Sequence, residues 1–417
     1  MKVFKFGGAS VKDAAGVRNV ANVLSHFPDD DLLIVVSAMG KTTNALEEVV
    51  WGYREGKDVA ERVEALRRAH AVVLAEVAPT DEAAQAELVL HFQRLRDLLL
   101  GKPSGNVDRD YDQIVSQGEI WSTLIVSAHL KHAGLANTWV DARTIVRTDD
   151  TYRSARVDWE TSERRASTLL AEVPGVPKRI VAQGFIGFST EGDTTTLGRE
   201  GSDFSAAIFA YLLDAESVTI WKDVPGMFNA DPKLFPDTKL LSHISYREAI
   251  ELSYFGASVI HPRTLQPLQK KHIPLYVRSF MDLAAPGSTI DDRSENDSLI
   301  PSFIVKPGQV LLSITPRDLS FVVEENLSGI FSVFSKHGVR VNMMQNSAVA
   351  FTVCADNDNR VKPLVMELRG DYEVKWNEGL ELLTVRHPDE ATLAKLTSGR
   401  EILLEQRSRT TARFVLK

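Results

Sequence analysis

Cysteine is nearly absent from this sequence, since Cys354 is the only one among 417 residues. No disulfide can form within the chain, and no cysteine-based zinc or iron–sulfur site can be built. Long apolar runs are missing as well, so the sequence predicts no segment that spans a bilayer. Residues 1–8 lack the apolar core of a signal peptide. We therefore expect a cytoplasmic protein with no membrane partner.

Basic residues are not in excess either. The chain carries 48 lysines and arginines against 56 aspartates and glutamates, a formal net charge of −8. An acidic protein is a poor partner for nucleic acid, and we expect no such partner. Hydrophobic residues make up 44% and charged residues 25% of the chain, which excludes a largely disordered, collagen-like or coiled-coil protein. The length predicts two or three domains.

The N-terminal pattern is that of an α/β protein. Val3–Phe6 is predicted to be a strand, residues 11–27 an amphipathic helix and Leu32–Ser37 a second strand. The second strand is almost entirely apolar, which indicates a sheet covered by helices on both faces. Later segments continue this alternation. We expect further helices within residues 44–100, 111–133 and 206–213, and further strands at Val140, Ile145-Val146, Ile180–Ala182 and Val218–Trp221.

The pattern changes in residues 286–308, which are rich in proline, glycine and polar side chains and which we interpret as a linker. This linker separates a large first domain, residues 1–285, from a smaller region, residues 309–417. Residues 310–376 have the β-α-β-β-α-β order of a ferredoxin-like fold. Residues 380–417 repeat part of that order. We expect this shorter unit to share its sheet with the first unit or with a second subunit.

A lysine and two glycines stand where the first predicted strand meets the first predicted helix. In Lys5–Ser10, the backbone amides of Gly7 and Gly8 can approach an anion closely, and Lys5 can reach the same anion. The spacing is not that of a Walker A loop. The motif therefore indicates a phosphate site, and a tight turn that merely requires glycine remains the alternative.

Two further segments place polar side chains at positions where a ligand could bind. Hydroxyls gather in Ser37–Asn44, at the end of a strand where α/β sheets bind ligands, although a capped helix start explains the same residues. Ser116–Glu119 places a carboxylate beside a glycine within a predicted helix. A buried Glu119 would need a cation such as a substrate ammonium, whereas a solvent-facing one would not.

The segment Thr194–Asp203 carries hydroxyls, glycines, an arginine and an aspartate ahead of an alanine-rich helix. Arg199 offers a planar fork for a carboxylate or phosphate, and Asp203 could hold lysines or a metal in register near the phosphates. Ser202 or Asp203 could instead cap the helix. The later segment Trp221–Lys233 mixes aromatic, turn-forming and lysine residues, which suits a nucleotide pocket or a plain loop.

Taken together, the motifs resemble those of one family, the aspartate kinases of the amino acid kinase superfamily. Five segments occur in that family's order and spacing: Lys5–Ser10, Ser116–Glu119, Thr195–Asp203, Trp221–Lys233 and Phe255–Pro262. Residues 310–376, and in part 380–417, resemble ACT domains. The resemblance covers nearly the whole chain. It implies a catalytic domain with an open sheet between helices, followed by a ferredoxin-like ACT regulatory region.

The resemblance implies ATP-dependent phosphorylation of the side-chain carboxylate of L-aspartate to 4-phospho-L-aspartate, the first step of lysine, threonine and methionine biosynthesis. It implies that Lys5 and Asp203 are catalytic. The residues implied to bind aspartate are Ser37, Thr43, Glu119, Arg199 and Ser202. The residues implied to bind ATP are Gly7, Gly8, Lys222, Asp223, Phe228, Lys233 and Ser258.

This reaction needs alignment and charge neutralisation more than acid–base chemistry. A carboxylate is already ionised at neutral pH, so its attack requires no general base, and we expect no histidine or serine nucleophile. Lysines, glycine amides and Mg²⁺ can neutralise the γ-phosphoryl group. We expect Mg²⁺ to be held mainly through the nucleotide phosphates, without a metal site formed by side chains alone.

Three positions depart from the family's pattern. Ala9 stands where members often have threonine, Ser258 where many have lysine, and Lys222 where many have threonine. A cation near the phosphates is therefore missing at position 258. We hypothesise that Lys222 replaces it.

The ACT resemblance implies an amino-acid effector and a homodimer or dimer of dimers. The effector in this family is usually lysine or threonine. Lysine-sensing relatives place acidic residues where this chain has Asn342 and Ala348, which argues against lysine as the effector. Asn342, Gln345 and Ser347 could bind a smaller amino acid, or they could be polar residues at the end of a strand.

Two other functions fit parts of the sequence. Another kinase of the superfamily would act on a different small carboxylate or on a nucleotide, but the ACT-like region and Ser116–Glu119 argue against it. A non-catalytic amino-acid sensor would use only the ACT-like region, but the presence of Lys5, Arg199 and Asp203 argues against that. We expect a monofunctional kinase, without the dehydrogenase that some relatives carry.

Overall fold

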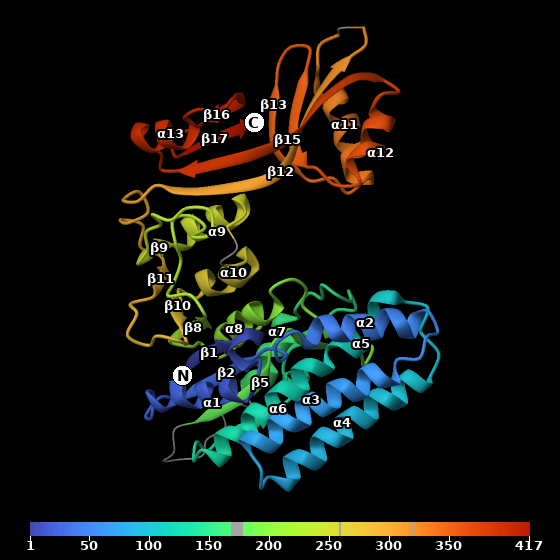
Figure 1. Cartoon of the computed structure of the whole chain (residues 1–417), viewed down its shortest axis with the longest axis vertical. Helices are drawn as coiled ribbons and strands as arrows, with labels where there is room; N and C mark the ends of the chain where they lie inside the picture. Colours follow the sequence, from blue (N-terminus) through green and yellow to red (C-terminus); the bar gives the residue numbers. More distant parts are fainter. Residues whose placement is uncertain (168–177, 258–259, 319) are drawn as a thin grey trace. The chain divides into compact units, whose positions relative to one another are not determined.

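The computed structural model describes residues 1–167, 178–257, 260–318 and 320–417 (Figure 1). The chain so described divides into two compact units. The first unit consists of Met1–Met227, Leu240–Ile250 and Val259–Ser294, and the second of Phe228–Lys239, Glu251–Ser258 and Glu295–Lys417. No helix of the described residues has the length and the apolar character that a membrane crossing requires.

A mainly parallel sheet forms the centre of the first unit. Its strands in the described residues are, in spatial order, β3 (Thr138–Val140), β5 (Arg179–Gln183), β2 (Leu32–Val36), β1 (Lys2–Phe6), β8 (Ser217–Lys222), β10 (Leu275–Ser279), β11 (Ser288–Asp291) and β9 (His243–Ser245). Neighbouring strands run parallel except for the antiparallel pair β10–β11. The expected strands at the N-terminus, at residues 180–182 and at residues 218–221 are confirmed.

Helices surround this sheet, as its apolar central strands require. Their bounds are α1 (Ala14–Ser25), α2 (Thr42–Arg54), α3 (Ala60–Val77), α4 (Glu82–Leu100), α5 (Val107–Val115), α6 (Gln117–His132), α7 (Trp159–Ala166), α8 (Gly201–Leu212), α9 (Tyr246–Phe255) and α10 (Pro262–Lys270). A smaller sheet of the described chain contains β4 (Arg147–Thr148), β6 (Ile186–Ser189) and β7 (Thr194–Thr196). Short 3₁₀ helices cover Gly8–Val11 and Ala142–Thr144.

The two faces of β1 have different neighbours because side chains alternate along a strand. Phe4 and Phe6 join the apolar core that contains residues of α1, α3, α4 and α6. Lys5, which lies between them, points to the other face and meets Asp203 of α8. The first strand therefore contributes to the core on one side and to a polar site on the other.

Two expectations for the first unit were wrong in detail. The single helix expected over 111–133 is two helices, α5 and α6, which meet at Ser116. Ile145 and Val146 form no strand, because their backbone amides donate to the carbonyl of Ala142 and close a turn. Both side chains are buried, so their apolar character reflected burial and not strand formation.

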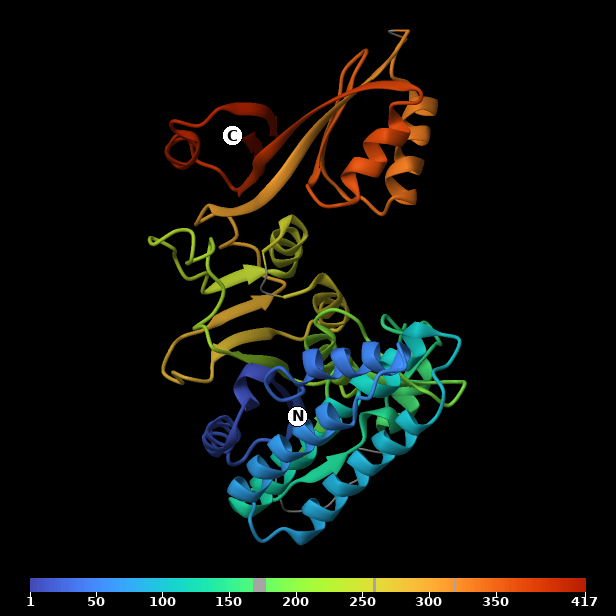
Figure 2. The same ribbon diagram turned by 45° about the vertical axis from the view of Figure 1, so that its right-hand side comes forward.

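An antiparallel sheet forms the centre of the second unit (Figure 1). Its strands in the described residues are, in spatial order, β13 (Val341–Asn346), β14 (Phe351–Asp356), β12 (Ser302–Pro316), β15 (Tyr372–Arg386), β17 (Thr411–Leu416) and β16 (Ile402–Arg407). The helices are α11 (Glu324–Lys336), α12 (Val361–Leu368) and α13 (Glu390–Thr397). Figure 2 shows α11 and α12 side by side against the sheet, as their shared apolar core requires. The expected α/β class with a ferredoxin-like C-terminal region is confirmed.

The strands β12 and β15 are longer than the sequence predicted. Residues 372–376 and 380–385 belong to one strand of 15 residues, and β12 begins at Ser302 instead of Val310. The segment Ser302–Lys306 pairs with the far half of β15, which in turn pairs with β17. The shorter C-terminal unit therefore shares its sheet with the first one, as one of the two expectations had it. The segment interpreted as a linker, 286–308, contains β11 and the first part of β12.

Candidate active site

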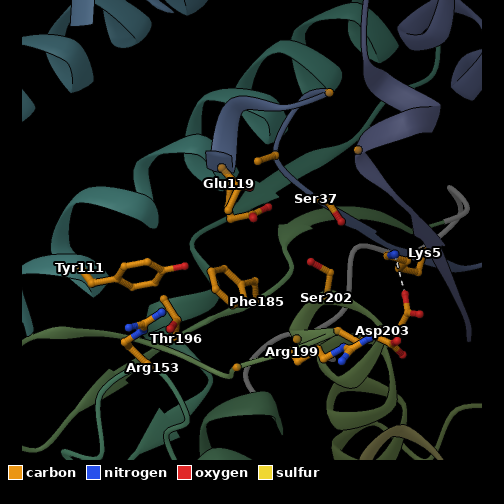
Figure 3. Close-up of a pocket in the computed structure, with 17 residues that line it drawn as sticks. Lys5, Ser37, Tyr111, Glu119, Arg153, Phe185, Thr196, Arg199, Ser202 and Asp203 are labelled. Carbon is orange, nitrogen blue, oxygen red and sulfur yellow. Dashed lines mark ion pairs between the residues drawn. The ribbon is translucent and has the colours of Figure 1, made fainter. Parts of the chain in front are cut away.

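A cavity of about 420 Å³ lies in the first unit, where β1, β2 and β5 reach their carboxyl ends (Figure 3). Crevices at this edge are where open α/β sheets bind ligands. The residues that line it are Lys5, Gly8, Ser37, Ala38, Gly40, Thr43, Tyr111, Glu119, Arg153, Phe185, Thr196, Gly198, Arg199, Glu200, Gly201, Ser202 and Asp203. The cavity thus brings together eight residues that the sequence had singled out.

The ion pair between Lys5 and Asp203 forms one end of the cavity (Figure 3). The Nζ atom of Lys5 lies 2.5 Å from Oδ1 of Asp203, and both side chains are buried. Lys222 is the last residue of β8, which is the parallel neighbour of β1, and its Nζ lies 3.9 Å from Oδ2 of Asp203. Two cations therefore share one carboxylate.

Glycine allows the loops after β1 and β2 to touch through their backbones. A Cβ atom on Gly8 would lie 2.7 Å from the carbonyl oxygen of Ala38, a distance that real Cβ atoms do not show. The amide of Gly40 donates to the carbonyl of Gly8 over 3.0 Å. The neighbouring Gly7 sits beside the ammonium of Lys5. The two glycines thus permit a close backbone approach next to a cation.

Glu119 is buried in the first turn of α6, at the top of the cavity in Figure 3. Its neighbour Gly118 makes this possible, because a Cβ there would lie 3.0 Å from Thr42 and 3.1 Å from Ala38. Glu119 accepts a hydrogen bond from the backbone of Ala38, while its Oε2 atom has no partner in the described chain. Burial raises the pKa of Glu119 to about 8, against the opposing pull of Lys5.

The loop between β7 and α8 supplies the opposite wall. Two of its residues, Gly198 and Glu200, adopt positive φ angles of 78° and 54°, which turn the chain sharply before α8 begins. The exposed guanidinium of Arg199 forms no ion pair within the described residues. Ser202 packs against Gly184, and a Cβ atom added to Gly184 would lie 2.6 Å from the Cβ atom of Ser202. Arg199 and Ser202 thus remain available to a ligand.

A buried carboxylate that the sequence did not single out joins two parts of the cavity wall. Asp112 of α5 accepts hydrogen bonds from the amide and the hydroxyl of Thr196, over 2.8 and 2.7 Å. It also accepts one from the amide of Arg153 over 3.0 Å. Burial raises the pKa of Asp112 to about 6. Asp112 therefore ties β7 and the loop before α7 to the helix that carries Tyr111.

Three other residues of the cavity were also missed. Phe185 follows Gly184 directly after β5, and this position at a strand end could have identified it. Tyr111 and Arg153 offered no such signal. Their contact, with the guanidinium 4.2 Å from the ring centre, joins two segments that are distant in the sequence.

Several predicted nucleotide ligands do not line this cavity. Lys222 does not line the cavity, but its ammonium lies near Asp203, which does. Asp223 follows β8 and is exposed. Phe228 and Lys233 belong to the second compact unit. Ser258 lies outside the described residues. The described residues also contain no group of three or more histidine, cysteine, aspartate or glutamate side chains that could hold a metal ion.

The three candidate effector residues lie at different places around β13. The side chain of Asn342 accepts from Lys306 over 2.9 Å and donates to Gln309 and Asp356, each over 2.8 Å. Gln345 is exposed, and the hydroxyl of Ser347 donates to the carbonyl of Ala350 in the following turn. The amide group of Asn342 is thus used within the second unit.

Comparison with known proteins identifies the family. Residues 1–279 match the model of the amino acid kinase family. Lysine-sensitive aspartokinase 3 of Escherichia coli K12 is 30% identical over 394 residues, which cover 92% of this chain and 86% of that protein. The bifunctional aspartokinase/homoserine dehydrogenase 2 of Arabidopsis thaliana is 32% identical over 84% of this chain. This chain spans only 39% of the length of that plant relative.

Solved structures agree with the sequence comparisons. Aspartokinase III of E. coli in complex with aspartate and ADP matches with a TM-score of 0.81 at 28% identity, over 100% of this chain and 96% of the other. The same protein in complex with lysine and aspartate matches with a TM-score of 0.82. The chain therefore belongs to the amino acid kinase family. Within that family it belongs with the aspartokinases, as the motifs predicted.

Proposed function

We propose that this chain transfers the γ-phosphoryl group of ATP to the side-chain carboxylate of L-aspartate, yielding 4-phospho-L-aspartate and ADP. The observation that carries the proposal is the joining of a cationic cluster, Lys5–Asp203–Lys222, with Glu119 and Arg199 around one cavity. The E. coli relative with 28% identity binds aspartate and ADP in its crystal structure. The relatives do not favour a kinase for another carboxylate or a non-catalytic sensor.

The charges of the cavity suit L-aspartate, which has one ammonium and two carboxylates. Glu119 accepts the ammonium, since a buried carboxylate without a partner on Oε2 gains a counter-ion when that group arrives. Arg199 pairs with a substrate carboxylate through its planar fork. Hydroxyl groups at the cavity surface complete the contacts with the substrate. They belong to Ser37, Thr43 and Ser202.

The nucleotide phosphates belong beside Lys5 and the glycine amides. ATP supplies the phosphoryl group, and the protein aligns it and neutralises its charge. Lys5 and Lys222 provide positive charge, and Asp203 keeps both ammonium groups in place. Gly7 and Gly8 let the backbone amides approach the phosphates closely. We expect Mg²⁺ to arrive with the nucleotide phosphates and to share in neutralising their charge.

The second unit binds an amino-acid effector, and the chain acts as a homodimer or dimer of dimers. The E. coli relative with a TM-score of 0.82 was crystallised with lysine. Neither position 342 nor position 348 of this chain carries a carboxylate for the distal ammonium of lysine. This difference favours an effector smaller than lysine. The reaction product feeds the synthesis of lysine, threonine and methionine.

A coupled assay of ADP release tests the proposed function. ADP release should depend on L-aspartate, and hydroxylamine should trap the acyl phosphate as a hydroxamate. Glutamate, acetylglutamate, carbamate and nucleoside monophosphates serve as competing acceptors. The Arg199→Gln variant should raise the KM for aspartate at least about tenfold, whereas Arg164→Gln, an exposed arginine of α7, should not. Faster ADP release with one of the other acceptors would reject the proposal.

A further inference from the structure

A second cavity of the first unit lies between α7, α8 and α10, and we call it the α7–α8–α10 cavity. Its volume is about 430 Å³, within the range of small-molecule sites. None of the residues that line the cavity at the proposed active site lines this one. The position and the lining therefore define a separate pocket.

Positive charge is concentrated on this pocket. Arg156, Arg263 and Lys270 line it, and no acidic side chain does so among the described residues. Across the described part of the chain, none of these three cations has a carboxylate within ion-pair distance. The neighbouring Lys271 differs, because it pairs with Asp214 over 2.5 Å. Arg263 and Lys270 thus line the pocket without an ion-paired carboxylate, whereas the charge of Arg156 also interacts with the carboxylate of Asp149.

Arg263 shows most clearly that a counter-ion is missing. Its side chain is half-buried, and burial lowers the pKa of its guanidinium. Its Nη1 donates to the carbonyl of Leu197 over 3.0 Å, and the group lies 4.8 Å from the ring centre of Phe204. Neither contact neutralises the charge. A partly desolvated cation is costly unless an anion approaches it.

Aromatic rings form the rest of the wall. Trp159, Phe204 and Tyr211 line the pocket, and the indole of Trp159 stands edge-on to Tyr211 at 4.9 Å between ring centres. Trp159 is only half-buried, so part of its indole remains open to a ligand. An indole surface next to guanidinium groups suits a planar ring attached to an anionic group.

We propose that the α7–α8–α10 cavity binds an organic anion that carries a planar ring. Nucleoside monophosphates and aromatic carboxylates share this chemistry. The ring lies against Trp159, and the anionic group pairs with Arg156, Arg263 and Lys270. The site is independent of the proposed function, because none of its residues contributes to the first cavity.

Isothermal titration calorimetry on the full chain tests the site. The probes are adenosine 5′-monophosphate and phenylpyruvate, with adenosine and inorganic phosphate as probes that lack the charge or the ring. At least one ring-bearing anion should bind about tenfold more tightly than both partial probes. The nucleotide and the aromatic acid distinguish the two sources of such a ligand. The proposal is overturned if neither ring-bearing anion binds, or if the partial probes bind equally well.

Variants locate the binding. Arg156→Gln combined with Lys270→Gln should weaken the ring-bearing anion by at least about tenfold, and folding should be preserved because both residues are exposed. Arg164→Gln removes an exposed arginine of α7 that does not line the pocket and is the matched control. Arg199→Gln removes a cation of the first cavity and should leave this binding unchanged. Undiminished binding in the double variant would place the ligand elsewhere and reject the site, whatever the result with Arg199→Gln.

Arg263 also connects this pocket with the first cavity. The carbonyl that it holds belongs to Leu197, which precedes Gly198 and Arg199 in the cavity wall. Occupancy of the α7–α8–α10 cavity should therefore change the apparent affinity for aspartate. This second readout rests on the proposed function, whereas the binding of the probes does not. Probe binding that leaves the affinity for aspartate unchanged would overturn the link through Arg263.

Discussion

The ammonium of Lys5 and the carboxylate of Asp203 lie 2.5 Å apart, although one belongs to the first strand and the other to α8. Both are buried, and Lys222 approaches the same carboxylate at 3.9 Å. Asp203 neutralises only part of the charge of two lysines. Asp203 therefore holds two cations together at the end of the cavity, and positive charge fixed in place is what a phosphoryl-transfer site requires.

The first prediction concerns Lys222. If it replaces the cation that is missing at position 258, Lys222→Met should raise the KM for ATP and lower kcat, with a loss of about tenfold or more in kcat/KM. Steady-state kinetics with varied ATP at saturating aspartate measure the change. Lys131→Met, an exposed lysine at the end of α6, is the control. A near-normal KM and kcat in Lys222→Met would count against this role.

The second prediction uses the raised pKa of Glu119. Since its pKa is about 8 in the folded chain without ligand, Glu119 is mainly protonated at pH 7. The substrate ammonium pairs with the ionised form, so binding of aspartate at pH 7 should release close to one proton. Calorimetry in buffers of different ionisation enthalpy measures this release. Glu119→Gln should bind more weakly and release none, and equal proton release in both proteins would contradict the prediction.

The same shift makes stability depend on pH. The pKa of Glu119 rises from about 4.5 when exposed to about 8 in the fold, so the folded chain binds more protons than the unfolded chain between these values. Its contribution to stability is complete below about pH 4.5 and is lost as the pH rises to about 8. Denaturant unfolding of the ligand-free chain should show this decline. Glu119→Gln should flatten it, and an identical decline in the variant would assign it to other groups.

The third prediction concerns Asp112. An asparagine has one oxygen acceptor, so Asp112→Asn leaves at least one donor of Thr196 or Arg153 without a partner. The variant should lose about 1–3 kcal/mol of stability and should have a raised KM for aspartate. Denaturant unfolding and kinetics measure both effects. Asp97→Asn, an exposed residue of α4, is the control. An unchanged KM would show that Asp112 does not position the cavity wall.

The fourth prediction concerns the contact between the loops after β1 and β2. In Gly8→Ala the new methyl group would meet the carbonyl of Ala38 at 2.7 Å, so the loops must separate. The variant should lose about 1–3 kcal/mol of stability and most of its affinity for nucleotide. Gly105→Ala is the control, because no atom lies within 4 Å of the added carbon. Normal nucleotide binding by Gly8→Ala would show that close backbone approach is not required.

Local patterns predicted much of the catalytic fold because the central strands are buried on both faces. Such a strand appears as a continuous apolar run, and β2 was predicted in this way, whereas β1 was predicted from the apolar residues on both sides of Lys5. The break at Ser116 escaped, because that residue keeps helical backbone angles, with φ −57° and ψ −24°. At the junction the amide of Glu119 donates to the carbonyl of Ser116, three residues back instead of four, over 3.2 Å.

In the second unit the sequence predicted strand ends that the structure does not have. Pro307 and Gly308 are turn signals, and they predicted a linker that ends just before a strand at Val310. In the structure they fall where the pairing of β12 with β15 shifts register, between Lys306 and Leu311. The irregularity is absorbed as a bulge because the ladder continues on both sides. Pairing with a distant strand thus outweighed the local signal.

The order and type of the chemistry-bearing residues were determined by the sequence alone: a lysine within the first strand and two glycines after it, a glutamate after Gly118, an arginine before α8 and an aspartate in the first turn of α8. Short-range spacing suffices for these features. Tertiary structure alone decided that Glu119 is buried and holds its proton, that Lys5 meets Asp203, and that Asp112 ties Thr196 to Arg153. Each of these depends on burial and on contacts between segments far apart in the chain, and no local pattern carries that information.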